Sequence, residues 1–513
     1  MRNKPTRRAV IAAAIAVWAT GCAGGSALRT PDKRTVRATF SYRLPEKQAG
    51  WLSDLRWLPL LERQTGVGVE LVSGGPSGSY NQRLDLALGN GELQDAVIAD
   101  LAQADIYGPQ GAFLDLAPLI RRHAPHIQRY LDDHRELRNL VTDKKGRIYG
   151  LPSETPRISR VTFGRADHFE QAGLTEDPRT VEEFTDALRA LRKTLGPTSR
   201  NYYPLSGRDS FLRWPQVFGA QLAVTSGTVR GINTPEIGDL TSAGFEEMIR
   251  WYRTLYTEKL IDPEFVSGAA SEDSWQQKML GGQASVAEDF FTRPSWFLSN
   301  GGPDNDPKFA MKVLPPFLDR DGEVAKVPAE PRWDVTEVLA INASSKRSLE
   351  VLAFLDHLYS RTGQTTMHYG KKGASYEVVG GQPRYTVTFE AENKRPEGTP
   401  AWNFLQDRMT FPAPVDDQAY YRWMDKFTRS FAEKYFATSL TETPIIKYDA
   451  GQLRERTNLL ASFQPWALSE LVRFVTGKRA LKEWDAFVGE ARDKRGYDRL
   501  QEIEQAAWDA MHN

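Results

Sequence analysis

Strand-like and helix-like patterns alternate along the first hundred residues of this chain. Apolar and polar residues alternate over 36–42 and again over 67–71, which is typical of strands. Between and after them, residues 51–65 and 84–88 carry apolar residues at helical spacing. Residues 95–100 then form a short apolar run bounded by acids, typical of a buried strand. This order predicts an α/β lobe built on a parallel sheet.

The middle of the chain continues the alternation. Strand patterns recur at residues 148–152, 160–163, 284–291 and 337–341. One helix start is explicit, because Thr180 is followed three residues later by Glu183, the spacing of a capping box. The C-terminal third has mostly helical periodicity. The fold class expected is therefore α/β with a helical C-terminal region.

Length and composition indicate two large lobes or more. Removing a 21-residue leader from 513 residues leaves 492, which exceeds what one ordinary core supports. With 66 basic and 66 acidic residues, the balance gives no support for nucleic-acid binding. One cysteine excludes an internal disulfide, so the core alone must stabilise the fold.

The N-terminus has the pattern of a bacterial lipoprotein signal. Four basic residues precede a short apolar run, and Cys22 follows small residues. Residues 1–22 are therefore predicted to be a signal with Cys22 as the lipidated (palmitate-type) residue, and residues 23–34 a flexible tether. Ala19 stands where such signals prefer Leu, which leaves an uncleaved anchor or a plain signal peptide as alternatives. The predicted location is the extracytoplasmic face of the cell membrane.

Motifs for catalysis and metal binding are missing from the sequence. There is no H-E-x-x-H, C-x-x-C, G-x-S-x-G or Walker A lysine, so no catalytic residue, metal or cofactor is predicted. His123 and His126 flank Pro125, which favours a loop over a metal site. Glu288 and Asp289 end an apolar run where ligand crevices form, but strand neighbours point to opposite sides.

Several tryptophans lie among polar, Pro or Gly neighbours instead of on apolar stripes. An indole stacks well on the C–H face of a sugar ring, while acids, amides and arginine bond its hydroxyls. Each of these tryptophans could also simply pack a loop. They are Trp214, Trp275, Trp296, Trp333 and Trp402.

Short segments in a fixed order resemble one family. They include residues 86–95 (LALGNGELQD), 110–116 (QGAFLDL), 146–152 (GRIYGLP) and 255–265 (LYTEKLIDPEF). The chain resembles the large extracellular solute-binding lipoproteins (family 1) of carbohydrate ABC transporters, such as alginate- and fructo-oligosaccharide-binding proteins. No single segment is specific, but their order over most of the chain is.

The resemblance implies a two-lobed periplasmic-binding-protein-like fold with hinge strands between the lobes. The N-terminal lobe would comprise residues 35–153 and about 335–400, and the C-terminal lobe 154–334 and about 401–513. The protein would be a monomer that is not an enzyme. It would bind a carbohydrate between the lobes, deliver it to ABC permease subunits, and touch the membrane through its lipid only.

Candidate ligand contacts follow from the aromatic pattern and the implied cleft. Trp214, Trp333 and Tyr376 would stack on sugar rings, and charged side chains would bond hydroxyls or a uronate. The full set is Arg157, Trp214, Asp289, Arg293, Trp296, Trp333, Asp334, Tyr376 and Trp402.

One departure and two alternatives remain. Many of these binders carry an acidic calcium loop after the helix that follows the hinge, but residues 195–204 contain no acid, so no calcium is predicted there. A chemosensory or peptide-binding lipoprotein could use the same fold. A lipid-anchored glycan hydrolase would need two carboxylates flanking a cleft, for which no motif is present.

Overall fold

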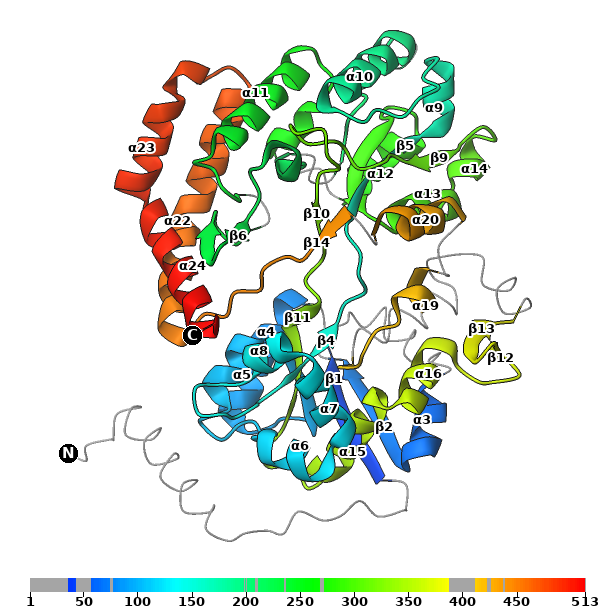
Figure 1. Cartoon of the computed structure of the whole chain (residues 1–513), viewed down its shortest axis with the longest axis vertical. Coiled ribbons are helices and arrows are strands. Elements are labelled where there is room, and N and C mark those ends of the chain that lie inside the picture. The colour runs from blue at the N-terminus through cyan, green and yellow to red at the C-terminus, as the bar shows by residue number, and fades with distance from the viewer. Residues whose placement is uncertain are drawn as a thin grey trace, which may run out of the picture.

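The protein has two lobes, one above the other, joined by segments that cross between them (Figure 1). A computed structural model describes residues 36–42, 57–73, 77–197, 199, 201–207, 211–234, 237–267, 272–386, 411–421, 426–436 and 439–512. Within these residues, no helix is long and apolar enough to cross a membrane.

The N-terminal lobe is built on a five-stranded sheet in the order β2-β1-β3-β11-β4. β1 (Val36–Tyr42) pairs in parallel with β2 (Val67–Ser73) and β3 (Ala96–Ala99), as the alternation predicts. β11 (Trp333–Ile341) returns from the other lobe and enters antiparallel between β3 and β4 (Leu151–Glu154). The parallel pairing predicted for the first three strands is confirmed, and the antiparallel β11 makes the whole sheet mixed.

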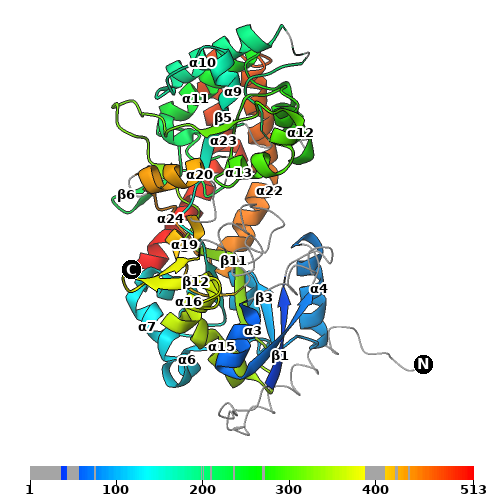
Figure 2. The ribbon, with the colours of Figure 1, turned by 90° about the vertical axis from the view of Figure 1, so that its right-hand side faces the viewer.

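Helices cover both faces of this sheet and enclose an aromatic core (Figure 2). Phe40 packs edge-on against Phe354 at 5.9 Å, and Trp57 packs edge-on against Phe411 at 5.7 Å between ring centroids. The helices are α3 (Leu58–Thr65), α4 (Ser77–Asn90), α5 (Leu101–Tyr107), α6 (Ala117–His123), α7 (Pro125–Asp133), α8 (Arg135–Val141), α15 (Ser348–Tyr359) and α16 (Arg361–Tyr369).

The C-terminal lobe contains a three-stranded antiparallel sheet in the order β8-β5-β9. These strands are β5 (Arg160–Arg165), β8 (Val286–Phe290) and β9 (Met311–Val313). The surrounding elements are α9 (Ala166–Gln171), α10 (Val181–Leu195), η2 (Pro215–Phe218), β6 (Ala223–Thr225), β7 (Thr228–Arg230), α11 (Ala243–Thr257), η3 (Pro263–Ser267), α12 (Glu272–Leu280), α13 (Arg293–Ser299) and α14 (Gly302–Asn305). The capping box predicted at Thr180 forms, because Thr180 accepts from the Glu183 N–H and Glu183 accepts in return.

The C-terminal helices form a layer along the upper lobe that reaches down to the lower one (Figure 1). They are α22 (Ala450–Val475), α23 (Trp484–Arg495) and α24 (Tyr497–His512). Their apolar faces join the core of the C-terminal lobe, with Phe463, Leu471 and Phe487 fully buried. The predicted helical C-terminal region is confirmed.

Several shorter elements complete the fold, some of them where the chain passes between the lobes. β10 (Val327–Pro328) pairs with β14 (Leu440–Thr441), and β12 (Tyr376–Val379) pairs with β13 (Gln382–Tyr385). The remaining elements are α19 (Asp417–Tyr421), α20 (Lys426–Phe431), the single π-turn η5 (Ala432–Phe436) and η6 (Leu481–Glu483).

The lower lobe extends further along the chain than predicted. Phe411 and Ala413 pack in its core, although a boundary near residue 401 would place them in the upper lobe. Ile445 and Met511 also pack against this core. No periodic pattern marks these contacts, because Phe411, Ala413 and Ile445 lie in irregular segments and Met511 is a single residue at the end of α24.

The histidine pair lies at a helix junction, so the predicted loop is wrong. His123 ends α6, and Pro125 begins α7, where a missing N–H costs nothing. His126 bonds Asp356 at 2.8 Å. Over the part of the chain that is described, no group of three or more His, Cys, Asp or Glu could hold a metal ion.

Candidate functional site

A cavity of about 410 Å³ lies in the C-terminal lobe beside the crossing segments. Its walls come from the start of β5, from η2, from residues 233–238, and from β10 and β14 with the residues that follow them. This volume, and the mixture of apolar walls with a few polar groups, are typical of ligand pockets. The polar and aromatic lining includes Arg160, Arg213, Trp214, Gln216, Glu288 and Glu330.

The backbone beside this cavity is strained. Leu212 and Trp214 both line it and have φ values of 59° and 66°, in the left-handed region that side chains disfavour. Each such residue costs about 1–3 kcal/mol, and such strain clusters at ligand clamps and active sites. Neighbours hold the segment in place: the Tyr252 hydroxyl accepts from the Arg213 N–H at 2.8 Å. The strain favours a functional role for this wall.

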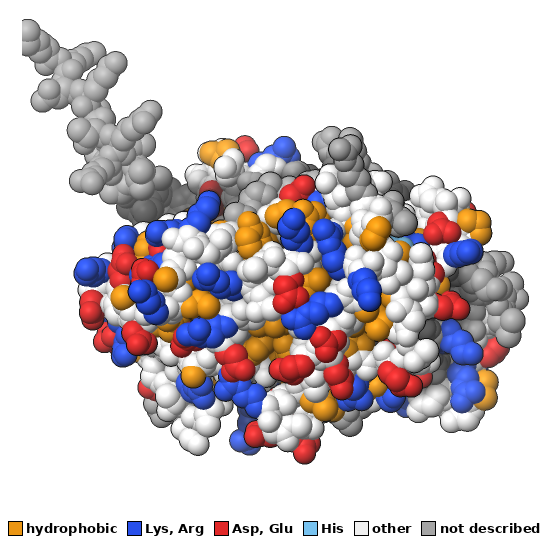
Figure 3. All heavy atoms as spheres, turned by 90° about the horizontal axis from the view of Figure 1, so that it is seen from above, with side chains coloured by type: hydrophobic (Ala, Val, Ile, Leu, Met, Phe, Trp, Pro, Cys, Tyr) orange, Lys and Arg blue, Asp and Glu red, His pale blue; other side chains and the backbone are white. Residues whose placement is uncertain are grey.

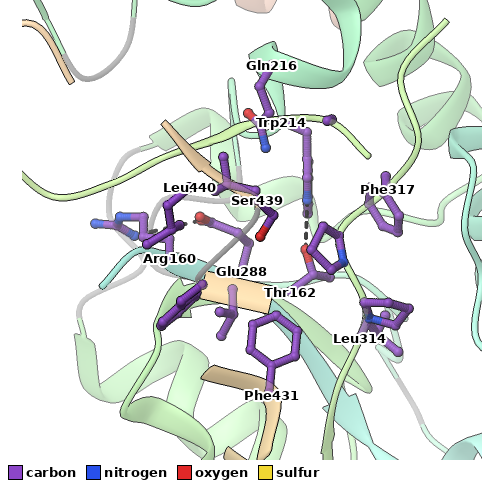
Figure 4. Close-up of a pocket in the computed structure, with 16 residues that line it drawn as sticks. Arg160, Thr162, Trp214, Gln216, Glu288, Leu314, Phe317, Phe431, Ser439 and Leu440 are labelled. Atoms are coloured by element: carbon purple, nitrogen blue, oxygen red, sulfur yellow. Dashed lines mark hydrogen bonds and ion pairs between the residues drawn. The ribbon is translucent and has the colours of Figure 1, made fainter. Parts of the chain in front are cut away.

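Trp214 is fixed by a hydrogen bond and by packing. Its indole nitrogen donates to Thr162 Oγ1 at 2.8 Å, a bond seen in Figure 4. Its ring packs against Phe184 at 5.8 Å and Trp251 at 5.6 Å. The residue is only 4% exposed, so it offers a limited, rigid surface to the cavity.

Charged side chains form a compact group on one wall. Glu288 Oε2 lies 3.4 Å from Arg213 Nε and 3.8 Å from Arg160 Nη1. The Glu288 and Arg160 side chains also border a recess of about 40 Å³ that adjoins the cavity (Figure 4). Burial raises the pKa of Glu330 above its usual range, while Arg160 and Arg213 oppose that rise. The two guanidinium groups thus lie close enough to Glu288 and Glu330 to offset part of their negative charge.

The loop at Asn233 is held by the C-terminal helices. Asn233 lines the cavity, and its N–H donates to Glu504 Oε1 at 3.2 Å. Its carbonyl accepts from Arg456, which also donates to Glu504 at 3.0 Å. Glu504 is fully buried on α24. Residues more than two hundred positions apart in sequence therefore shape one wall.

A buried ion-pair network spans the hinge. Glu154 ends β4 and pairs with Arg332, which also donates to Asp417 at 3.0 Å. The Tyr130 hydroxyl donates to Glu154 at 2.7 Å. Burial raises the pKa of Glu154, and Arg332 opposes the rise. This network joins the ends of two crossing segments with α19, where a change in lobe angle must be absorbed.

A larger hollow, of about 730 Å³, lies between α5, α8 and the ends of α22 and α24. Lys447 borders it and donates to the Thr142 carbonyl at 3.0 Å. The same ammonium group lies 3.1 Å from Asp105 Oδ2. Burial raises the pKa of Asp105, and the positive charge of Lys447 opposes that rise. This hollow offers Tyr448 as its one large aromatic ring, so the cavity at Trp214 is the better candidate for a sugar.

The predicted contacts do not all lie at one place. Trp214 lines the cavity, and Arg157 lies at the hinge with its guanidinium 3.7 Å from Glu442. Asp289 and Arg293 form a buried pair at 3.3 Å behind the strand, with Arg293 stacked over Trp296 at 5.4 Å.

The other predicted contacts lie elsewhere. Trp333 packs in the core of the lower lobe and is only 7% exposed. Trp275 is fully buried in the upper lobe. Asp334 caps its own turn by accepting from Thr336. Tyr376 packs on Tyr369 in a small separate cluster. Trp402 lies outside the described residues.

Most polar residues of the cavity were not predicted from the sequence. Arg160 begins a strand and Glu330 precedes a proline, but nothing in local periodicity marks them or Arg213. Glu288 was noted, and the expectation that it and Asp289 point to opposite sides agrees with the structure: Glu288 lines the cavity and Asp289 does not.

Charge on the outer surface does not point to a polyanionic partner. Seen from above, basic and acidic side chains are interspersed over the upper lobe without a large field of one sign (Figure 3). Selection among ligands therefore depends on the local groups in the cavity.

The comparisons with known proteins agree on a family. The sequence profile of bacterial extracellular solute-binding proteins matches residues 48–365. The lipoprotein LipO of Bacillus subtilis is 24% identical over 365 residues, covering 68% of this chain and 69% of LipO. A fructooligosaccharide ABC transporter substrate-binding protein, FusA of Streptococcus pneumoniae, is 24% identical over 278 residues, covering 50% of this chain and 49% of FusA.

Solved structures show the same fold. The alginate-binding protein AlgQ2 matches with a TM-score of 0.69 at 18% identity, over 94% of this chain and 99% of AlgQ2. A solute-binding protein of Bifidobacterium longum subsp. infantis matches with a TM-score of 0.70 at 17% identity, over 94% of this chain and 100% of that protein. The two-lobed α/β fold predicted from the sequence is confirmed.

Proposed function

The chain belongs to the bacterial extracellular solute-binding proteins, and on that premise we propose that it captures an oligosaccharide between its lobes and delivers it to an ABC permease. The observation that carries the proposal is the cavity at Trp214, where a fixed indole, amide side chains and ionised groups converge beside the hinge. The similarity to FusA, a fructooligosaccharide ABC transporter substrate-binding protein, supports the same ligand class.

Binding would be linked to lobe closure. A ligand stabilises a closed state only by its differential affinity for that state, so contacts from both lobes are required. The cavity borders the crossing segments, through Pro328, Glu330 and Glu442, so a sugar seated there would touch the parts that move. The Glu154–Arg332–Asp417 network would adjust as the angle changes.

The cavity is better suited to binding than to catalysis. Glycoside hydrolysis needs a proton-donating carboxylic acid and a second carboxylate that acts as base or nucleophile. Glu288 lies within 3.4 Å of Arg213 and 3.8 Å of Arg160, an environment that favours a hydrogen-bond acceptor over an acid. The family and fold are those of binding proteins.

The remaining part of the proposal concerns location. Cys22 would carry the lipid, residues 23–34 would act as a tether, and the monomeric receptor would stay on the extracytoplasmic face. Labelling cells with an alkyne-tagged fatty acid tests this. Label is expected on the wild-type protein and not on Cys22→Ser; label on both, or on neither, would contradict lipidation at this residue.

Titration calorimetry on the full-length protein in mild detergent tests the ligand class. The panel contains neutral, acidic and amino oligosaccharides together with short peptides. Micromolar or tighter binding of a sugar that is recovered uncleaved supports the proposal. Binding of peptides alone would favour a peptide receptor, and a shortened sugar would favour a hydrolase.

A further inference from the structure

We propose that the cavity at Trp214 selects neutral oligosaccharides and rejects those that carry uronate groups, an inference that rests on the proposed function. It concerns the charge of the ligand, which the fold and the family leave open. Three features of the cavity wall carry it: the count of charges, the existing partners of each arginine, and a buried acceptor.

The first feature is an excess of carboxyl groups. Glu288, Glu330 and Glu442 line the cavity, against two guanidinium groups, Arg160 and Arg213. Among the described residues that line it there is no Lys, His or Asp. A ligand carboxylate would therefore enter a site that already holds more negative than positive groups. In a partly desolvated pocket, such repulsion is weakened less than it would be in water.

The second feature is that the arginines near the site already have carboxylate partners. Arg160 contacts Asp289 at 3.4 Å and Glu288 at 3.8 Å. Arg213 contacts Glu288 at 3.4 Å, and the hinge residue Arg157 contacts Glu442 at 3.7 Å. A uronate could gain an arginine only by displacing one of these carboxylates, which would then lose its own partner.

The third feature is a buried acceptor without a donor. Gln221 lines the cavity, and its Oε1 has no hydrogen-bond partner among the described residues. A buried acceptor without a donor costs about 1–3 kcal/mol. A sugar hydroxyl supplies the missing proton, and a uronate has one hydroxyl fewer per ring because a carboxylate replaces its C6 hydroxymethyl group. The carboxylates of the wall likewise accept hydroxyl protons, so the cavity is matched to a ligand rich in hydroxyl groups.

The test uses ligand pairs that differ only in charge. Titration calorimetry on the full-length protein compares trigalacturonate with its methyl ester, and glucosamine trimer with its N-acetylated form, beside neutral fructo-, gluco- and mannotriose. At least one neutral sugar is expected to bind. Where a methyl ester binds, the free acid should bind about tenfold or more weakly, because its carboxylates meet the carboxyl groups of the wall.

A variant pair supplies an independent readout. Glu442→Gln removes one negative charge from the wall and releases Arg157, and its side chain is 66% exposed, so the fold should tolerate the change. It should raise the ratio of uronate affinity to neutral-sugar affinity about threefold to tenfold. Glu92→Gln changes an exposed residue of the lower lobe, removes the same charge away from the cavity, and should leave that ratio unchanged.

The outcomes separate the two proposals. Equal or tighter binding of a uronate than of its ester would overturn charge selection and leave oligosaccharide capture standing. Tighter binding of glucosamine trimer than of the N-acetylated trimer would show selection of cations instead of neutral sugars, and would also overturn it. Absence of binding by every sugar would overturn the proposed function itself.

Discussion

Replacing Glu504 by Gln tests whether the C-terminal helices hold the cavity in shape. Glu504 is 0% exposed. Its carboxylate accepts from the Asn233 N–H at 3.2 Å and from Arg456 Nε at 3.0 Å, with the Tyr448 hydroxyl as a third partner. Because Asn233 lines the cavity, one buried carboxylate connects the helical region to the proposed ligand.

The expected loss of stability follows from burial. Glu504→Gln keeps the shape of the side chain but leaves the Arg456 side chain, 13% exposed, facing a neutral amide. Removing one partner of a buried ion pair costs about 3–5 kcal/mol, and the lower end applies because Gln retains one acceptor oxygen. In a unit of roughly 250 residues, 1 kcal/mol shifts Tm by about 2–4 °C, so a fall of about 6–12 °C is expected.

Differential scanning calorimetry of the full-length protein measures this shift. The matched control is Glu502→Gln on the same helix, where the side chain is 64% exposed and pairs only at the surface with Arg499. The control should lower Tm by less than about 2 °C. Calorimetric titration with the best sugar should show weaker binding by Glu504→Gln alone. Equal Tm values for the two variants would refute the reasoning.

Three further predictions concern other parts of the fold. Burial lowers the pKa of His168 from 6.5 to about 4. The unfolded chain therefore takes up this proton first, and stability is lost as pH falls from 6.5 through 4. The loss should approach about 3 kcal/mol, and His168→Asn, which can still bond Ser285, should remove it in denaturant titrations at several pH values. Neither EDTA nor added calcium should move Tm by more than about 1 °C, because residues 195–204 contain no acid; a larger shift in calorimetry would reveal a calcium site. Trp214→Phe removes an indole hydrogen bond of 2.8 Å at the cavity and should weaken sugar binding about threefold to tenfold. Trp466→Phe changes a ring that packs on Phe487 among the C-terminal helices, away from the cavity lining, so an equal loss of affinity in both variants would contradict a role for Trp214 in the site.

The fold was predictable where one side-chain period governs a whole element. The alternation at residues 36–42 corresponds to β1, whose inward residues Ala38 and Phe40 are buried. Residues 160–163 likewise lie within β5. The direction of β11 was not predictable, because strand polarity within a sheet depends on where the chain returns from, not on its own pattern.

The site was predictable only in part. Trp214 stood out because an aromatic beside Pro215 fits no apolar stripe. Its neighbours in space come from other segments: Glu288 was marked by the apolar run that it ends, but Glu330 carries no local signal. Conversely, Trp333 and Tyr376 look unusual in sequence but pack in apolar clusters. Composition of the flanking residues cannot distinguish a ring that faces a ligand from one that closes a core.

The C-terminal helices provide a physical route between the lower lobe and the cavity. Lys447 contacts Asp105 and the Thr142 carbonyl of the lower lobe, and the next residue, Tyr448, donates to Glu504. Glu504 in turn holds Asn233 in the cavity wall. A displacement of the lower lobe against Lys447 must therefore strain the same buried carboxylate that shapes the cavity. Because coupling of this kind is reciprocal, a ligand that fixes Asn233 would also favour one position of the lower lobe. If so, Glu504→Gln should weaken sugar binding and, with it, the ligand-induced gain in Tm, whereas Glu502→Gln on the same helix should change neither.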